Sequence, residues 1–303
     1  MNNTNQKSTS NVYAIGESLL DVIFKLDDTV TAKPGGSMLN ACISLGRLGH
    51  NVHFLTEYGN DMAGDKIEAF LNENSVNSNF SIRHKERKSS LALAWLNESG
   101  NASYSFYQDL PTEAPIIKLP AFTPNDILLF GSFYAINSRN RNNILNLLKQ
   151  AKAGGALVLY DPNIRPSKFK DTQETRNQIM ELIEQVDIVK ASDEDFSYIF
   201  RTTDHIEVLE KLRQLKKLFF VTSGKNGVDI VFNGSIKHLS IPCLEPVSTV
   251  GAGDNFNAGI IHAVLSQAIK KPFTEQDILM MAEQGIALAS EVCLRTENYI
   301  ARR

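Results

Sequence analysis

Short apolar runs alternate with helix-like stretches along most of the chain. The apolar runs predict strands at residues 12–16, 52–56, 126–130, 156–160, 187–190 and 218–222. The stretches between them predict helices at residues 37–48, 64–72, 139–153, 172–185 and 205–214. Strands that alternate with helices pair in parallel through right-handed crossovers, and continuously apolar strands are covered on both faces. The pattern therefore predicts an α/β fold, with a doubly wound, mostly parallel sheet and helices on both faces.

Two segments break this alternation and predict antiparallel hairpins. The first joins residues 89–97 to residues 102–108 across a turn rich in Asn, Ser and Gly. The second joins residues 228–232 to residues 236–241 across an Asn-Gly pair. We expect the first hairpin to be an insertion that lies over the doubly wound core.

Composition narrows the class of protein. The 303 residues are 43% hydrophobic and 21% charged, with a formal net charge of −3. The hydrophobic content excludes a disordered chain. The slightly negative net charge argues against a nucleic-acid-binding protein, which would carry an excess of basic residues. No apolar stretch approaches the roughly 18 residues that span a bilayer. We expect neither a nucleic acid nor a membrane as partner and, by default, a cytoplasmic location.

The chain carries no sign of division into domains. It has no internal repeat and no linker, so we expect a single domain over residues 1–303. Residues 1–11, rich in Asn, Ser and Thr, are predicted to form a disordered leader. The three cysteines lie far apart in apolar surroundings and are predicted to be buried structural thiols: Cys42, Cys243 and Cys293.

The sharpest chemical signal is the small-residue turn Gly251-Ala252-Gly253, followed by Asp254 and an apolar, helix-like run. Small residues let backbone N–H groups approach an anion, and the positive end of the new helix adds to this attraction. Asp254 can then act as a general base beside a phosphate, although an aspartate at a helix start also serves as a plain N-cap. Neither a Walker A pattern nor GxGxxG occurs, so this turn is the best candidate for handling phosphate.

A second polar cluster lies near the N-terminus. Gly35 and Gly36 directly precede the helix predicted at residues 37–48 and would bring the backbone close to a ligand. The side chains of Asp21 and Asn40 suit sugar hydroxyl groups. The structural alternative is a pair of turn glycines with a helix-facing asparagine.

Together these segments resemble the two signatures of the ribokinase-like (PfkB) carbohydrate kinases. The first signature is matched by Gly35-Gly36 with Asn40, by Leu45-Gly46-Arg47-Leu48-Gly49 and by Gly59-Asn60-Asp61. Residues 247–259 resemble the second signature, commonly written DTxGAGD, and the resemblance extends over about residues 12–295. Within the family, fructokinases and ketodeoxygluconate kinases are similar at Gly16-Glu17 and at Asp161-Pro162-Asn163-x-Arg165.

This resemblance implies an ATP-dependent kinase that phosphorylates a primary hydroxyl of a sugar. Asp254 would be the base, and the backbone N–H groups of residues 251–253 would stabilise charge on the transferring phosphoryl group. The residues implied to hold the sugar are Asp21, Gly35, Gly36, Asn40, Tyr104, Phe106, Asn163 and Arg165. The residues implied to hold the nucleotide are Thr222, Gly224, Gly227 and Asn257. Mg²⁺ would accompany ATP, largely through phosphate and water. A surface ion pair is the simpler alternative for Arg165.

The inserted hairpin gains a role from the same resemblance. Residues 88–109, together with about residues 20–34, would form a small β lid that excludes water from the reaction. Tyr104 and Phe106 would face the sugar, although an aromatic stripe also commonly packs in a core. In many relatives the lid builds a dimer interface, so a homodimer through the lid is a further expectation.

Two positions depart from the family pattern. Ser248 stands where the second signature begins with aspartate, a residue linked in relatives to a monovalent cation, which argues against activation by potassium. The family's NxxE motif is here Ser192-Asp193-Glu194-Asp195, so Asp195 replaces the glutamate with a side chain one methylene shorter. Asp195 is therefore expected to support the metal only indirectly.

The specific prediction is a fructokinase that converts D-fructose to fructose 6-phosphate. Phosphorylation of 2-keto-3-deoxygluconate or of ribose is the alternative within the family, and Arg165 would suit the carboxylate of the former. A catalytically silent sugar- or nucleotide-binding regulator is the alternative outside catalysis. A nucleotide-dependent oxidoreductase is disfavoured because GxGxxG is missing.

Overall fold

Nine strands of the described chain form the central sheet. The structure is a computed structural model that describes residues 10–96, 102–165 and 171–303. The strands are β1 (Asn11–Ile15), β4 (Asn51–Leu55), β6 (Val76–Asn77), β10 (Ile127–Gly131), β11 (Leu157–Asp161), β12 (Ile188–Ser192), β13 (Leu218–Thr222), β14 (Val228–Phe232) and β15 (Ser235–Leu239). Their order is β15-β14-β13-β12-β11-β10-β1-β4-β6. All pairs from β6 to β13 are parallel, whereas β14 and β15 pair antiparallel. The predicted mostly parallel sheet is confirmed.

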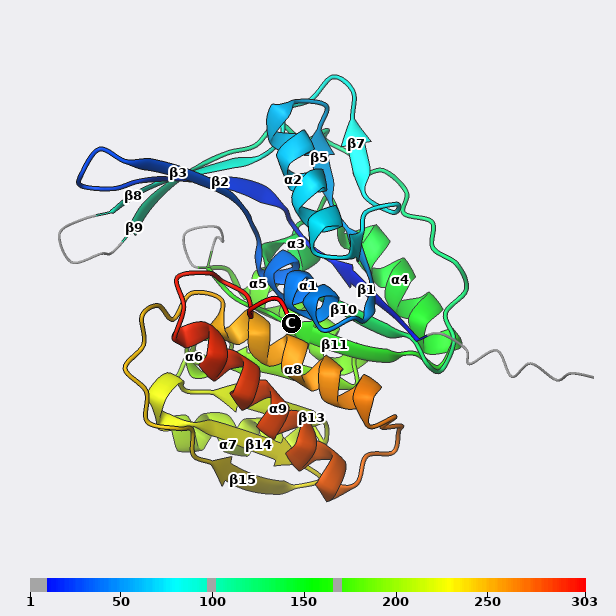
Figure 1. Cartoon of the computed structure of the whole chain (residues 1–303). Helices are drawn as coiled ribbons and strands as arrows, with labels where there is room; N and C mark the ends of the chain where they lie inside the picture. Colours follow the sequence, from blue (N-terminus) through cyan, green and yellow to red (C-terminus); the bar gives the residue numbers. More distant parts are fainter. Residues whose placement is uncertain (1–9, 97–101, 166–170) are drawn as a thin grey trace, which may run out of the picture.

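Helices cover both faces of this sheet (Figure 1). One face packs against α1 (Ser37–Arg47), α2 (Met62–Glu73), α8 (Ala252–Ser266) and α9 (Glu275–Cys293). The other packs against α3 (Ser132–Ile136), α4 (Arg141–Ala153), α5 (Gln173–Gln185), α6 (Asp193–Phe200) and α7 (His205–Gln214). Strand β1 shows why both faces need cover. Its residues Val12 and Ala14 pack in the core on the α1 side of the sheet, whereas Tyr13 and Ile15 pack in the core on the α4 side. Successive side chains point to opposite faces, so an all-apolar strand needs cover on both sides.

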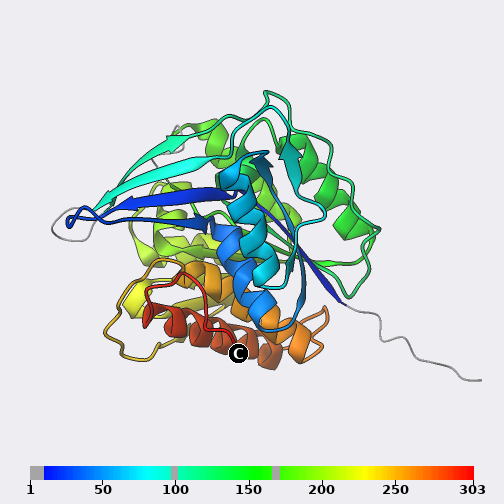
Figure 2. The ribbon, with the colours of Figure 1, turned by 45° about the horizontal axis from the view of Figure 1, so that its top comes forward.

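A second sheet extends away from the body of the molecule (Figures 1 and 2). It has the order β3-β2-β8-β9 and contains β2 (Leu19–Phe24), β3 (Val30–Gly35), β8 (Leu91–Leu96) and β9 (Ala102–Tyr107). We call these four strands the lid sheet. Outside it, β5 (Glu57–Gly59) and β7 (Ile82–His84) pair in parallel. The predicted hairpin of β8 and β9 is present, and its turn lies outside the described residues.

The structure corrects several details of the prediction. Residues 1–9 lie outside the described residues, but Asn11 already belongs to β1, so the predicted leader is too long. Cys42 is buried as expected, whereas Cys243 is exposed. The apolar pattern alone did not reveal α3, α6 and α9, although Thr274 and Asp277 form a capping box at the start of α9. No helix in the described part of the chain is both long and apolar enough to cross a membrane.

Candidate active site

Asp254 lies in the first turn of α8, where it meets the first turn of α1. The Ser37 hydroxyl donates to Asp254 Oδ1 at 2.6 Å, and the Asn40 amide donates to Asp254 Oδ2 at 2.8 Å. Asn163, in the loop that follows β11, donates its side-chain amide to Ser37 Oγ. Parallel strands bring the loops that follow them to one edge of a sheet, which is where ligands bind in this class of fold. Three segments far apart in the sequence thus meet at one carboxylate.

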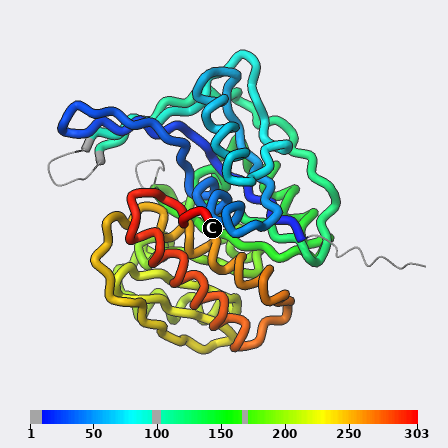
Figure 3. The backbone as a smooth tube through the Cα atoms, viewed as in Figure 1, coloured from blue at the N-terminus to red at the C-terminus, as the bar shows by residue number. Residues whose placement is uncertain are grey.

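The turn before Asp254 can only be built from small residues. Gly251 has φ of 84°, and a Cβ there would come within 2.6 Å of the Asn298 carbonyl oxygen. The Asn255 amide fixes this turn by donating to the carbonyl oxygens of Gly251 at 2.7 Å and of Asn298 at 2.8 Å. The C-terminal segment that carries Asn298 is drawn in red in Figure 3, next to α1 and α8.

The backbone N–H groups of this turn are arranged to receive an anion. Within the described residues, the N–H groups of Gly251 and Gly253 have no hydrogen-bond acceptor, while that of Ala252 donates to the Thr249 carbonyl at 3.2 Å. They lie at the start of α8, a 15-residue helix, where the helix dipole adds positive potential. The turn therefore offers two free donors and a positive helix end beside the Asp254 carboxylate.

A buried ion pair lies directly behind the turn. Lys190 Nζ, on β12, is 3.1 Å from Oδ2 of Asp161 at the end of β11. The Asn257 amide donates to the same oxygen at 2.6 Å, and the Asn163 backbone N–H donates to Oδ1 at 3.1 Å. A Cβ on Gly253 would come within 2.7 Å of Lys190 Nζ, so the ammonium group lies against the glycine turn.

Burial dominates the protonation of the two other carboxyl groups here. It raises the pKa of Asp254 above its usual range, and the hydrogen bonds from Ser37 and Asn40 partly offset this effect. Burial and the nearby charge of Asp161 also raise the pKa of Asp195. A raised pKa makes a carboxylate a better proton acceptor near neutral pH, which is what a general base requires.

The predicted sugar-side residues gather between the lid sheet and the β11 loop. A Cβ on Gly35 would lie 2.0 Å from Asp21 Oδ2, so the Asp21 carboxylate rests against that glycine. Burial and the charge of Asp21 raise the pKa of Tyr104, and the charge of Arg165 opposes this change. Tyr104 stacks on Phe106 with ring centroids 5.7 Å apart, and both residues are about half exposed. The two aromatic residues are thus not part of the core.

The predicted nucleotide-side residues form a separate turn after β13. Thr222 ends β13 beside Ser192, and Gly224 and Gly227 adopt positive φ values of 51° and 102°. A Cβ on Gly227 would come within 2.4 Å of the Leu239 carbonyl oxygen. Asn257 is fully buried and bonds to Asp161, so the structure groups it with the ion pair and not with this turn.

Comparisons with known proteins show the family of this chain. Residues 9–301 match the family model described as pfkB family carbohydrate kinase. This chain belongs to the pfkB family. It is therefore a sugar phosphotransferase, and its doubly wound fold is that of ribokinase-like kinases.

Several relatives of this pfkB kinase carry the name fructokinase. A fructokinase of Vibrio alginolyticus is 26% identical and the alignment covers 86% of this chain and 89% of the relative. Fructokinase-1 of Zea mays is 28% identical, with 90% and 87% covered. Among solved structures, fructokinase from Vibrio cholerae O395 with fructose, ADP and calcium has a TM-score of 0.86 at 22% identity, covering 96% of this chain and 94% of the other. Aminoimidazole riboside kinase from Salmonella enterica has a TM-score of 0.85 at 20% identity, covering 97% of both chains.

Asp195 stands in this pfkB kinase where the NxxE motif of the family has the longer glutamate, and its contacts show how the shorter side chain is held. Its Oδ2 accepts from the backbone N–H and hydroxyl of Ser192, both at 2.8 Å, in a capping box that begins α6. Its Oδ1 accepts from the Ile164 backbone N–H at 2.7 Å. Asp195 thus fixes the loop that carries Asn163. No group of three or more His, Cys, Asp or Glu in the described ranges could hold a metal ion.

Ser248, which stands where the second family signature begins with aspartate, forms part of a backbone turn. Its hydroxyl accepts from the Val250 backbone N–H at 3.2 Å, and its own N–H donates to the Cys293 carbonyl at 3.3 Å. It presents a hydroxyl where the family pattern has a carboxylate, so this position supplies no negative charge for a cation.

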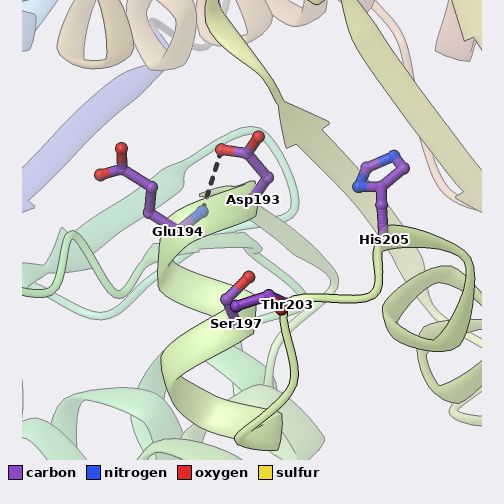
Figure 4. Close-up of a pocket in the computed structure, with 5 residues that line it drawn as sticks. All are labelled: Asp193, Glu194, Ser197, Thr203 and His205. Atoms are coloured by element: carbon purple, nitrogen blue, oxygen red, sulfur yellow. Dashed lines mark hydrogen bonds between the residues drawn. The ribbon is translucent and has the colours of Figure 1, made fainter.

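A pocket of about 330 Å³ lies at the start of α6. Figure 4 shows its lining by Asp193, Glu194, Ser197, Thr203 and His205. None of the residues that surround Asp254 lines it. None of the site residues predicted from the sequence lines it either.

Sequence reasoning missed three residues of the site: Ser37, Asp161 and Lys190. A lysine within the apolar run of β12 was a usable signal, because a buried lysine needs a charged partner. Asp161 begins the motif Asp161-Pro162-Asn163-x-Arg165, but nothing in the sequence pairs it with Lys190. Ser37 is the first residue of α1, and a serine at a helix start gives no signal of a role in the site.

Proposed function

We propose that this protein transfers the γ-phosphoryl group of ATP to a primary hydroxyl of D-fructose, giving fructose 6-phosphate and ADP. The observation that carries the proposal is the Asp254 carboxylate, held from both sides by Ser37 and Asn40 next to the free N–H groups of Gly251 and Gly253. A base and an anion-stabilising turn side by side suit attack of a hydroxyl on phosphorus.

Each group has one task in the reaction. Asp254 accepts the proton of the attacking hydroxyl as the oxygen–phosphorus bond forms and the bond to the leaving ADP breaks. The N–H groups of Gly251 and Gly253 donate to the equatorial oxygens of the phosphoryl group, where charge is spread in the transition state. The positive end of α8 stabilises the same charge.

Sugar binding is assigned to the polar groups around Asp254. The side-chain oxygen of Asn40 is buried without a hydrogen-bond partner in the described part of the structure, so it is available to accept from a sugar hydroxyl. Asp21, Gly35, Gly36 and Asn163 complete this wall. Tyr104 and Phe106, on the lid sheet, are proposed to close over the sugar and exclude water.

The nucleotide is assigned to the turn of Thr222, Gly224 and Gly227. Backbone at positive φ next to a strand end leaves room for a ligand without a Cβ in the way. Mg²⁺ supplies charge neutralisation to the phosphates when bound. The donor set fits a metal held mainly by phosphate and water, because the oxygens of Asp195 already accept from the chain and Asp161 is paired with Lys190.

The names of the relatives support fructose as the phosphoryl acceptor. Arg165 supports an alternative acceptor that carries a carboxylate. Arg165 is exposed, and its hydrogen bond within the described chain is a long one of 3.4 Å to the Ile164 carbonyl. A guanidinium that has no carboxylate partner among residues 10–96, 102–165 and 171–303 would suit a substrate carboxylate, as in 2-keto-3-deoxygluconate.

The lid sheet also supports a proposal about assembly. Its outer strand β9 presents an unpaired edge with exposed aromatic side chains, including Tyr104 and Tyr107. Exposed edges and apolar patches favour association with a second chain. We propose a homodimer through this sheet, which light scattering of the purified protein tests.

Release of ADP, measured with fructose, ribose and 2-keto-3-deoxygluconate, tests the substrate. We expect the highest kcat/KM with fructose. The variant Arg165→Met is expected to change kcat/KM for fructose less than about threefold, because neutral sugars gain little from a single exposed charge. A higher kcat/KM for the sugar acid than for fructose, lost in Arg165→Met, would assign the acid as substrate. Absence of turnover with every sugar would favour a binding protein.

A further inference from the structure

The Ser37 hydroxyl connects the proposed base to the loop after β11. Its oxygen is 2.6 Å from Asp254 Oδ1 and also receives the side-chain amide of Asn163. The amide nitrogen can only donate and the ionised carboxylate can only accept. The two contacts are therefore satisfied together in one way, with Asn163 donating to Ser37 and the Ser37 proton pointing at Asp254.

We infer that Ser37 is a positioning residue for phosphoryl transfer, which holds the Asp254 carboxylate oriented and ionised before the sugar arrives. This inference rests on the role of Asp254 proposed above. Ser37 fixes Oδ1, while Asn40 fixes Oδ2 from the same helix at 2.8 Å. The carboxylate is thus restrained at both oxygens, and its remaining lone pairs are left for the attacking hydroxyl.

An ordinary helix-capping role does not account for the Ser37 side chain. The N-cap of α1 is Gly36, and no side-chain hydrogen bond caps this helix. The partners of the Ser37 hydroxyl within the described residues are Asp254 and Asn163, and neither belongs to α1. Its hydrogen-bonding capacity is therefore directed to the site and not to the helix.

Loss of this hydroxyl has a defined consequence for pH dependence. Burial raises the pKa of Asp254, and the Ser37 hydrogen bond is one of the contacts that lower it. Asn40 also lowers this pKa, Asp161 raises it and Lys190 lowers it. Without the Ser37 hydrogen bond, less of the effect of burial on the pKa of Asp254 is offset. Asp254 therefore keeps its proton to a higher pH. The fraction of enzyme with an ionised base at mildly acidic pH then falls.

The test is the pH profile of kcat/KM for the sugar, which reports groups of the free enzyme. For Ser37→Ala we expect the acid limb to move to higher pH, with a loss of kcat/KM of about tenfold on the acid limb that shrinks to less than about threefold at pH 9. Ser37→Thr keeps the hydroxyl and is expected to restore the wild-type profile. Asn163→Ala, which frees the hydroxyl to rotate, is expected to move the limb in the same direction by less.

Controls separate this inference from a general loss of stability and from the proposed function. Ser81→Ala removes a hydroxyl that donates to the Phe54 carbonyl at 2.7 Å, away from Asp254, and is expected to leave the profile unchanged. A loss in Ser37→Ala that is equal at every pH, or an unchanged profile, overturns the role of Ser37. If Asp254→Asn retains wild-type turnover in the same assay, the base assignment itself is wrong. If Asp254→Asn is inactive and the Ser37→Ala profile is wild type, only the inference about Ser37 fails.

Discussion

Asp254→Asn is expected to lower kcat by about 10²–10⁴-fold while the sugar still binds. The amide has nearly the shape of the carboxylate but cannot accept the proton of the attacking hydroxyl. It can still accept from the Ser37 hydroxyl, so the first turns of α1 and α8 keep contact. Steady-state ADP release gives kcat, and calorimetric titration with sugar gives the binding constant.

The stability of the same variant provides an independent check. Burial raises the pKa of Asp254, which means that folding disfavours its ionised form. This penalty is absent well below the unfolded pKa and complete above the folded pKa, so a neutral amide is expected to keep or raise Tm at neutral pH.

The matched control is Asp277→Asn, in the first turn of α9. Asp277 belongs to a capping box with Thr274 and is only partly buried, so its loss is expected to lower stability slightly and to leave kcat unchanged. Wild-type kcat in Asp254→Asn, or an equal loss in both variants, would contradict the assignment of the base.

Lys190→Met is expected to lower the free energy of unfolding by about 3–5 kcal/mol. Asp161 is fully buried, and the ammonium of Lys190 is the charged partner 3.1 Å from its carboxylate. Removing one member of a buried pair leaves the other charge uncompensated in a medium of low dielectric. Urea denaturation measures the loss, and kcat is also expected to fall because Nζ lies against Gly253 of the anion-stabilising turn.

Two further variants make this prediction specific. Arg139→Met breaks a second buried ion pair, in which Arg139 donates to the two oxygens of Glu57 at 2.7 and 2.6 Å. We expect a comparable loss of stability without the loss of kcat, because this pair lies outside the Asp254 site. Adding Asp161→Asn to Lys190→Met is expected to recover part of the stability. If the double variant is no more stable than Lys190→Met, the unpaired carboxylate is not the cause.

The motifs of the site could be read from the sequence because they depend on local backbone. The glycine turn before Asp254 requires φ of 84° at Gly251 and close approach to Asn298, and small residues are the only solution. The same holds for Gly35 and Gly36, where a Cβ would meet Asp21 or the Glu17 carbonyl. Such constraints are written into residue type at a fixed spacing, which is why a family signature exists.

The partners of those motifs could not be read in the same way. Ser37 and Asp254 are 217 positions apart, and Lys190 lies 29 positions from Asp161. Nothing in the local pattern at Ser37 differs from an ordinary helix start. The spacing of Asn257 from Asp254 likewise did not reveal that its side-chain amide donates to Asp161.

The sequence alone determined the parallel α/β architecture, the hairpin of β8 and β9 and the glycine turn before Asp254, because periodicity and turn geometry are local properties. The tertiary structure decided how Asp254 is held and which charge compensates Asp161. It also decided that Asp195 accepts one hydrogen bond from Ile164 in the loop after β11 and two from Ser192 at the end of β12. These contacts arise where the ends of parallel strands from distant parts of the chain converge. Hydrogen bonds and ion pairs act over a few ångströms in space, so only the folded chain selects the partner of each buried polar group.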